Sequence, residues 1–276
     1  IWLYLLKLSV TRRSWWLIVF AAAPPIVSII DTGQINLVVF ALFTIAWGCL
    51  LLRRYPWAVG ISLGLATILK IFPIIFLPYL ILKKQYTAAI SFIITLGLIT
   101  LLALPIFGIS GWQMFLTDRL PAVLNGDIGY AQTSISLYGS LRTAILAGTY
   151  DSFGDRLKDV IAITDIPYKI VTLAGFAAMV YYLWRKRQQT GWWQYVVDYS
   201  LLLLFITLTS EIVHQHYLIW LAPTVIWLST QWWNWSWWLR LLFSLGIILT
   251  LFQKYLGFLD FMTVVVKPGT LGMLCL

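Results

Sequence analysis

One charged side chain, Lys70, interrupts an apolar stretch that runs from residue 57 to residue 82. An ammonium group at membrane depth costs several kcal/mol unless it meets an anion or water. A phosphate carried by a lipid is the most natural anion there. Pro73, which follows shortly after, would break a helix and allow the chain to reverse. The sequence therefore predicts that Lys70 binds a phosphate group, with snorkelling of the lysine to the interface as the alternative.

Further polar side chains could complete an anion site. Arg142 lies in a mildly apolar segment, and a guanidinium suits phosphate. The chain's two histidines, His214 and His216, stand near Glu211. A histidine there could neutralise a departing phosphate, bind a divalent metal with Glu211, or shuttle a proton. We predict that the phosphate-binding residues are Lys70, Arg142 and His216.

A short polar turn ahead of a predicted helix supplies two more candidates. Gly33 allows the turn, and Asn36 could either cap the helix or donate to a ligand. The predicted substrate-site residues are Gln34, Asn36, Glu211 and His214, with helix capping and an interfacial polar turn as the alternatives. The sequence has no glycine-rich phosphate loop, no Ser-His-Asp set and no CxxC motif, so nucleotide-driven chemistry has no support. We predict no cofactor, because a His-x-His pair is a weak metal signal by itself.

The composition places these residues in a membrane protein. Hydrophobic residues make up 61% of the 276, charged residues 11%, and the mean hydropathy is +0.87. A soluble domain carries about 25% charged residues. We therefore predict an all-α, polytopic transmembrane protein with a single transmembrane domain over residues 1–276. The net charge of +9 comes from short basic clusters between apolar spans, so no nucleic-acid partner is expected.

Both ends of the chain look like interrupted spans. The sequence begins at Ile1 inside an apolar segment, and Thr270–Leu276 resemble the start of another span. We therefore expect a fragment that is truncated at both ends.

Basic residues predict which side of the membrane each loop faces. Cytoplasmic loops carry an excess of Lys and Arg, and the pairs Arg53-Arg54 and Lys83-Lys84 flank the apolar stretch. If both pairs are cytoplasmic, residues 57–82 enter the membrane and return as a short hairpin. Each arm of about 13 residues spans about 19 Å of a hydrocarbon core of about 30 Å. The alternative, one long tilted span, would place the basic run 185–187 outside.

The same topology gathers the candidate residues on the outer face. Residues 107–168 are predicted to form an external loop region with interfacial helices, and the 33–36 turn and the histidine cluster face the same side. A transporter would more often scatter such groups through the bilayer centre. A polar site on the outer face of a plasma membrane, which we expect to be bacterial, indicates chemistry on lipid-borne substrates.

These motifs resemble those of a known family. The run Gly33-Gln34-x-Asn36, the helix with Gly60 and Gly64, Lys70-x-x-Pro73 and Lys83-Lys84 resembles glycosyltransferase family 87 of the GT-C superfamily. That family includes mycobacterial mannosyltransferases and arabinofuranosyltransferases that use polyprenyl-phosphate sugars. The likeness is looser over residues 136–142 and over 209–217, where His216 aligns best with the histidine that the family retains.

The resemblance implies an inverting, GT-C-type glycosyltransferase. Such an enzyme would transfer a mannose-like or arabinose-like sugar from a polyprenyl-phosphate donor to a lipid or glycan acceptor on the outer face. Its partners would be the donor, the acceptor and membrane lipids. The family's general base is an acid of the first external loop, which would precede Ile1, so the catalytic base is left unassigned. Two rivals stay open: a flippase or transporter of lipid-linked sugars, and a polymerase or ligase with a lipid-pyrophosphate donor.

Overall fold

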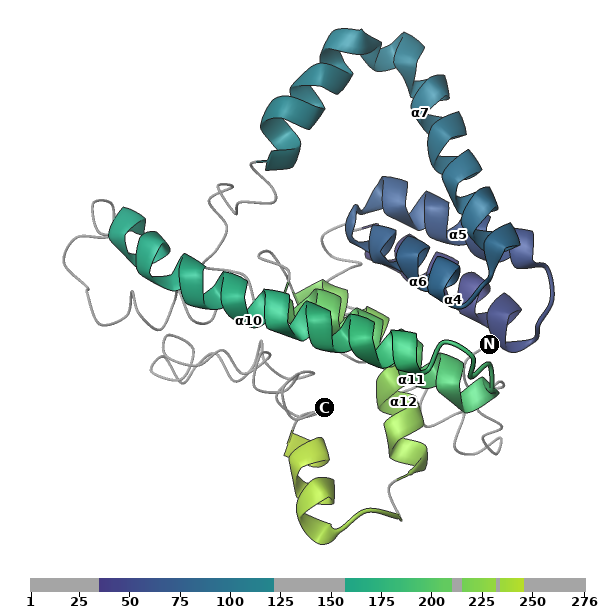
Figure 1. Ribbon diagram of the computed structural model, residues 1–276, viewed down its shortest axis with the longest axis vertical. Coiled ribbons are helices and arrows are strands. Elements are labelled where there is room, and N and C mark those ends of the chain that lie inside the picture. The colour runs from purple at the N-terminus through teal and green to yellow at the C-terminus, as the bar shows by residue number, and fades with distance from the viewer. Residues whose placement is uncertain (1–34, 122–156, 210–214, 232–233, 246–276) are drawn as a thin grey trace. The chain divides into compact units, whose positions relative to one another are not determined.

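The computed structural model describes residues 35–121, 157–209, 215–231 and 234–245, and every regular element in these ranges is helical (Figure 1). The prediction of an all-α chain is confirmed for this part. The elements are α4 (Asn36–Leu51), α5 (Pro56–Leu69), η1 (Phe72–Ile75), α6 (Phe76–Leu82), α7 (Tyr86–Met114), η2 (Phe115–Arg119), α10 (Leu157–Arg185), α11 (Trp192–Thr209), η4 (Gln215–Leu221) and α12 (Ala222–Thr230).

The chain divides into two compact units. From residue 34 onward, unit 1 takes Gln34–Asp127 and Met179–Leu202, and unit 2 takes Ile128–Ala178 and Leu203–Leu276. Both α10 and α11 therefore begin in one unit and end in the other. Asn36, Lys70 and the polar network presented below lie in unit 1, whereas η4, which contains His216, lies in unit 2.

Helix α4 forms where the sequence predicts a span, and its spacing of apolar residues explains its packing. Val39, Phe43, Ala46 and Trp47 recur at helical intervals, so they share one face. All four are fully buried. Helix α5 begins with Pro56 in its first turn, where the missing N–H would be unpaired in any case.

Helices α5 and α7 approach closely at two glycines. A Cβ on Gly60 would lie 2.0 Å from the carbonyl oxygen of Ala88 and 2.6 Å from the amide nitrogen of Phe92. A Cβ on Gly64 would lie 2.9 Å from the Cβ of Thr95. Small residues four apart let two helix backbones come together, as membrane helices often do. The Gly60/Gly64 pair therefore sets the spacing between α5 and α7.

We expect Gly60→Ala to destabilise the protein and Gly97→Ala to leave it intact. The added methyl at residue 60 meets backbone atoms that cannot move aside, and such overpacking costs about 1–3 kcal/mol. Gly97 lies on α7, the helix that Gly60 approaches, but a Cβ there meets nothing within 4 Å. The thermal midpoints of the two purified variants in the same detergent provide the comparison. Equal midpoints would mean that α5 and α7 do not pack through Gly60.

The two basic pairs adopt the same turn at the ends of α4 and α6. In both turns the first residue after the cap has a positive φ, 52° at Arg53 and 57° at Lys84. Glycine usually occupies this position, because a side chain there costs about 1–2 kcal/mol. Four backbone bonds close the turns: Arg53 to Leu50 (3.1 Å), Arg54 to Cys49 (3.0 Å), Lys84 to Ile81 (3.0 Å) and Gln85 to Leu80 (2.9 Å), each an N–H donating to a carbonyl.

The apolar stretch 57–82 is broken at Lys70 rather than forming a single rod. Helix α5 ends at Leu69, and Lys70 is extended with φ −149° and ψ 125° before η1 and α6 follow. Pro56 and Gln85, which flank the stretch, line the same cavity. The stretch 57–82 therefore begins and ends at the same end of unit 1, in agreement with a reversal near Lys70.

The segment 186–190 joins both basic pairs at that end. The Arg53 guanidinium donates to the carbonyl of Thr190 at 2.9 Å. The Lys83 ammonium donates to the carbonyls of Lys186 and Gln189, at 3.0 Å each. We call this part of unit 1 the basic end.

Helix α7 extends beyond the span that hydropathy predicts. Hydropathy predicts a span over residues 87–105, but the helix continues to Met114 with a kink at Gly108, where φ is 67°. Figure 1 shows that α7 bends sharply partway along its length. Its buried residues (Ala88, Ala89, Phe92 and Thr95) all lie in the first part.

The predicted external loop region, 107–168, is helical wherever the structure describes it. Helix α7 and η2 carry the chain to Arg119, and α10 begins at Leu157 instead of near Lys169. Hydropathy marks where apolar side chains begin, whereas backbone hydrogen bonding also extends helices through polar residues. The middle of the region lies outside the described residues.

Candidate functional site

Asn36 is the candidate residue with the most unusual surroundings. It is the first residue of α4 and is fully buried. Within the part of the chain that the structure describes, neither its side-chain oxygen nor its side-chain nitrogen has a hydrogen-bond partner. The suggestion that Asn36 caps the helix is wrong, because Ile35 is the N-cap residue and no side-chain cap bond is formed.

An unpaired buried amide costs about 1–3 kcal/mol, and such groups are rare in folded proteins. A carboxamide offers two N–H donors and one carbonyl acceptor. The Asn36 side chain can therefore bind a ligand that both accepts and donates hydrogen bonds, such as a sugar hydroxyl or a phosphate ester.

Lys70 lies at the same end of unit 1 as Asn36. Helices α4 and α5 pack against each other and are joined by only residues 52–55, so they run antiparallel. The first residue of α4 and the residue that follows α5 are therefore at the same end of the pair, which we call the Lys70 end. With 16 residues in α4, this end is about 24 Å from the basic end. Lys70 is partly exposed there.

The remaining predicted site residues cannot be placed against these two. Gln34, Arg142, Glu211 and His214 lie outside the described residues, and so does the side chain of His216 in η4. Among the predicted residues that the structure describes, only Asn36 and Lys70 are brought to one end. Within the described ranges there is no group of three or more His, Cys, Asp or Glu side chains that could hold a metal ion.

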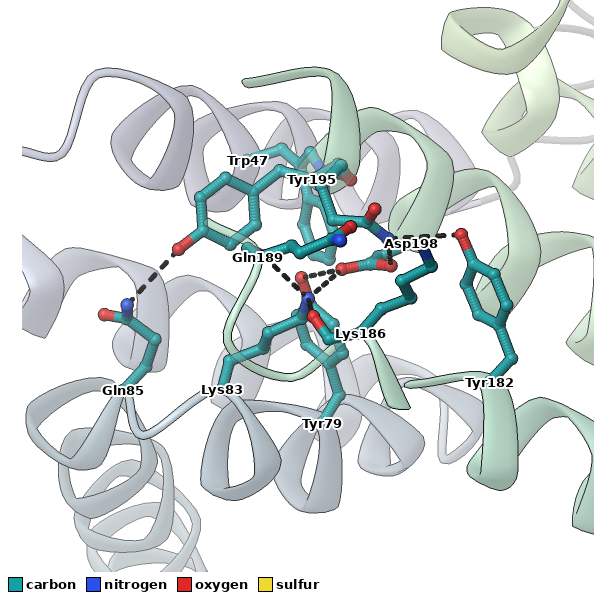
Figure 2. Close-up of polar contacts among 10 residues, drawn as sticks. Trp47, Tyr79, Lys83, Gln85, Tyr182, Lys186, Gln189, Tyr195 and Asp198 are labelled. Carbon is teal, nitrogen blue, oxygen red and sulfur yellow. Dashed lines mark hydrogen bonds and ion pairs between the residues drawn. The ribbon is translucent and has the colours of Figure 1, made fainter. Parts of the chain in front are cut away.

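The basic end contains a buried ion pair that sequence reasoning missed. The Nζ of Lys83 lies 2.8 Å from Oδ2 of Asp198, and both side chains are 0% exposed (Figure 2). Lys83 also donates to the two carbonyls of the 186–190 segment, so all three N–H groups of the ammonium have acceptors. Lys83 was expected to be an ordinary cytoplasmic loop cation; instead, it is a core residue.

The Asp198 carboxylate is equally well satisfied. The Tyr79 hydroxyl donates to Oδ2 at 3.1 Å, and the Gln194 amide donates to Oδ1 at 2.7 Å. Gln194 also donates to the Tyr182 hydroxyl at 3.2 Å. As Figure 2 shows, this network links α6, the end of α10 and the start of α11. Because each charged group has its partners, we interpret the network as a structural connection rather than a reacting site.

An aromatic cluster covers the network on the α4 side. The Trp47 ring stacks on Tyr79 with centroids 5.8 Å apart and packs against Tyr199 at 4.5 Å. Its indole N–H donates to the carbonyl of Tyr195 at 2.8 Å. One sequence signal could have found this site: Asp198 is the only acid on the predicted cytoplasmic side, amid many cations.

The described part of the chain is thus helical, and two of the predicted site residues, Asn36 and Lys70, lie at one end of unit 1. Residues 1–210 match glycosyltransferase family 87, and the chain belongs to this family. The resemblance drawn from the sequence motifs is thus confirmed.

The chain is also similar to a protein whose activity is known. The chain is 25% identical over 234 residues to the polyprenol-phosphate-mannose-dependent alpha-(1-2)-phosphatidylinositol mannoside mannosyltransferase of Mycobacterium tuberculosis. The match covers 80% of this chain and 49% of the relative, so the chain spans about half the length of the relative. No solved structure matches.

Proposed function

We propose that this protein is a bacterial membrane glycosyltransferase that transfers mannose from a polyprenyl-phosphate donor to a lipid or glycan acceptor on the outer face. The observation that carries the proposal is the fully buried Asn36 amide, which has no hydrogen-bond partner among the described residues and lies at the end that also holds Lys70. Family membership supports sugar transfer, and the name of the mycobacterial relative supports a polyprenyl-phosphate mannose donor.

The helices support a polytopic membrane protein. Within the described residues, two helical segments are long and apolar enough to cross a bilayer: Tyr86–Arg119 and Ile166–Arg185. The first has a mean hydropathy of 2.5 over its most apolar window, of which only 6% is buried. Apolar surface of this extent suits lipid better than water. The basic residues gathered at one end suit the cytoplasmic side, which would turn the Lys70 end outward.

The proposed reaction is a direct displacement. The acceptor hydroxyl attacks the anomeric carbon as the bond from that carbon to the phosphate oxygen breaks, and the configuration inverts. The hydroxyl proton passes to a carboxylate that we do not assign to any described residue. The departing polyprenyl phosphate gains negative charge, which fixed cations stabilise. Lys70 is the cation we place there, with Arg142 and His216 as further members, while Asn36 orients the donor.

We expect Asn36→Leu to lower transfer at least about tenfold while leaving the fold intact. Losing a hydrogen bond to bound substrate costs about 1–3 kcal/mol, whereas replacing an unpaired buried amide with an apolar group of similar size is neutral or stabilising. The test measures mannose transfer from polyprenyl-phosphate mannose in membranes carrying the complete gene product, together with the thermal midpoint.

Thr44→Val on the same helix is the matched control for Asn36→Leu. The Thr44 hydroxyl donates to the carbonyl of Phe40, one helical turn earlier, at 2.9 Å. Because this hydroxyl bonds to its own helix, the Thr44→Val variant should transfer mannose normally. Undiminished transfer by Asn36→Leu would remove Asn36 from the site. Movement of the donor across the membrane without any sugar transfer, by the unaltered protein, would favour the flippase instead.

A further inference from the structure

A polar cavity opens at the basic end, opposite to the proposed transfer site. It has a volume of about 270 Å³. Its polar lining comes from Arg53 and Arg54 after α4, Gln85 before α7, and Thr190 and Tyr195 around the start of α11. The Gln85 amide donates to the Tyr195 hydroxyl at 3.4 Å, across the lining (Figure 2).

The described lining of the cavity carries positive charge. Among the residues that the structure describes, this lining includes two arginines and no Asp or Glu. The nearest described acid in the network, Asp198, is already paired with Lys83. Arg53 uses one of its five N–H donors on the carbonyl of Thr190. In the part of the chain that the structure describes, the Arg54 guanidinium has no hydrogen bond or ion pair.

The backbone holds Arg53 in a conformation that glycine would adopt more easily. Arg53 has φ 52° and Tyr55 has φ 52°, both in the left-handed region. Non-glycine residues in this region carry strain, and such strain clusters at ligand sites. Arg53 thus occupies a position whose conformation favours glycine, which favours a role for its side chain in binding a ligand.

Exposed aromatic residues indicate where this cavity lies relative to lipid. Tyr55 and Trp57 flank Pro56, which lines the cavity, and Trp193 lies two residues before Tyr195. All three aromatic side chains are more than half exposed. Exposed Trp and Tyr gather at the level of lipid headgroups. This step uses the membrane disposition of the proposed function, although it does not depend on sugar transfer.

From these features we infer that the Arg53/Arg54 cavity binds the phosphate group of an anionic phospholipid from the leaflet at the basic end. Two guanidiniums provide forked donors that match phosphate oxygens, and the Gln85 and Tyr195 side chains can bind the rest of a polar headgroup. Basic pockets between membrane helices on the cytoplasmic side take acidic headgroups in this way. The site is about 24 Å from the Lys70 end, so it is separate from the donor site.

The test measures phosphatidylglycerol binding by native mass spectrometry of the complete protein from bilayer nanodiscs. These contain phosphatidylcholine alone or a mixture with phosphatidylglycerol. We expect bound phosphatidylglycerol on the unaltered protein, and about fivefold weaker retention for each of Arg53→Gly and Arg54→Gln. Arg53→Gly relieves the left-handed strain, so its thermal midpoint should be no lower than that of the unaltered protein.

Arg185→Gln is the matched control, because Arg185 is an exposed cation of the same end that does not line the cavity. Its retention of phosphatidylglycerol should be unchanged. Equal losses in all three variants would overturn the site in favour of general surface charge. If millimolar inorganic phosphate displaces the lipid in the same nanodiscs, the proposal of a lipid ligand is overturned in favour of a soluble anion.

Lipid binding and sugar transfer are read separately. A protein that binds phosphatidylglycerol through Arg53 and Arg54 but transfers no mannose supports this site while contradicting the proposed transferase. A protein that does not float with lipid vesicles contradicts the membrane disposition, and with it this site.

Discussion

Lys83→Met should lower the free energy of unfolding by about 3–5 kcal/mol, the largest effect on stability that we expect in this chain. The change removes the only cation that contacts the Asp198 carboxylate among the described residues, and both side chains are fully buried. Asp198 would keep its bonds from Tyr79 and Gln194 but lose its counter-charge. Two backbone carbonyls, of Lys186 and Gln189, would also lose their donor.

Lys84→Met is a closely matched control, because the two lysines are adjacent and Lys84 is exposed. A surface cation contributes less than about 1 kcal/mol, so this variant should unfold almost as the unaltered protein does. The measurement is unfolding of the purified protein in mixed detergent micelles as the denaturing detergent is increased.

The double variant Lys83→Met/Asp198→Asn distinguishes a buried pair from two independent contributions. Removing the charge of Asp198 together with its partner avoids leaving an isolated buried ion, so the double variant should be less destabilised than the sum of the single variants. Strictly additive losses would show that the two side chains are not coupled.

Lys70→Ala should reduce mannose transfer by about 10²–10³-fold, the largest effect on activity that we expect. Lys70 is a cation at the same end of unit 1 as the buried Asn36 amide, which has no hydrogen-bond partner in the described ranges. Removing one preorganised donor from a developing anion typically has an effect of this size. Lys70 terminates α5 in an extended conformation and is partly exposed, so the thermal midpoint should change little.

Lys70→Arg retains the positive charge and should recover part of the transfer, because a guanidinium also binds phosphate. Lys84→Ala removes a lysine from the basic end and should transfer normally. The assay follows initial rates at several concentrations of polyprenyl-phosphate mannose in membranes with equal amounts of protein. Normal rates for Lys70→Ala would exclude Lys70 from the site of the departing phosphate.

Several features followed from local signals along the chain. The apolar span before Arg53-Arg54 predicted α4, and Pro73 predicted a break near Lys70, where the structure ends α5 at Leu69. Hydropathy placed the first part of α7 correctly but missed its continuation to Met114, since a polar sequence can remain helical. Family membership was visible in the same motifs, because they keep their residue types in sequence order.

Other features could not be read from neighbouring residues. Lys83 and Lys84 look alike in sequence, yet only Lys83 is buried. Asp198 makes the burial of Lys83 tolerable because it supplies the opposite charge. Asp198 is distant along the chain: it is 119 residues from Tyr79, which donates to the same carboxylate. The cavity with Arg53 and Arg54 likewise needs the 190–195 segment to complete its lining.

The amino-acid sequence by itself determined the helical class, the break at Lys70 and the family. It could do so because hydropathy, charge and motif spacing are properties of the chain read in order. Only the tertiary structure decided that Asn36 is a buried amide with no hydrogen-bond partner among the described residues, that Gly60 touches a neighbouring backbone and that Lys83 is a core residue. These depend on which distant segments pack together, and burial turns the same side chain from a solvated group into one that needs a partner.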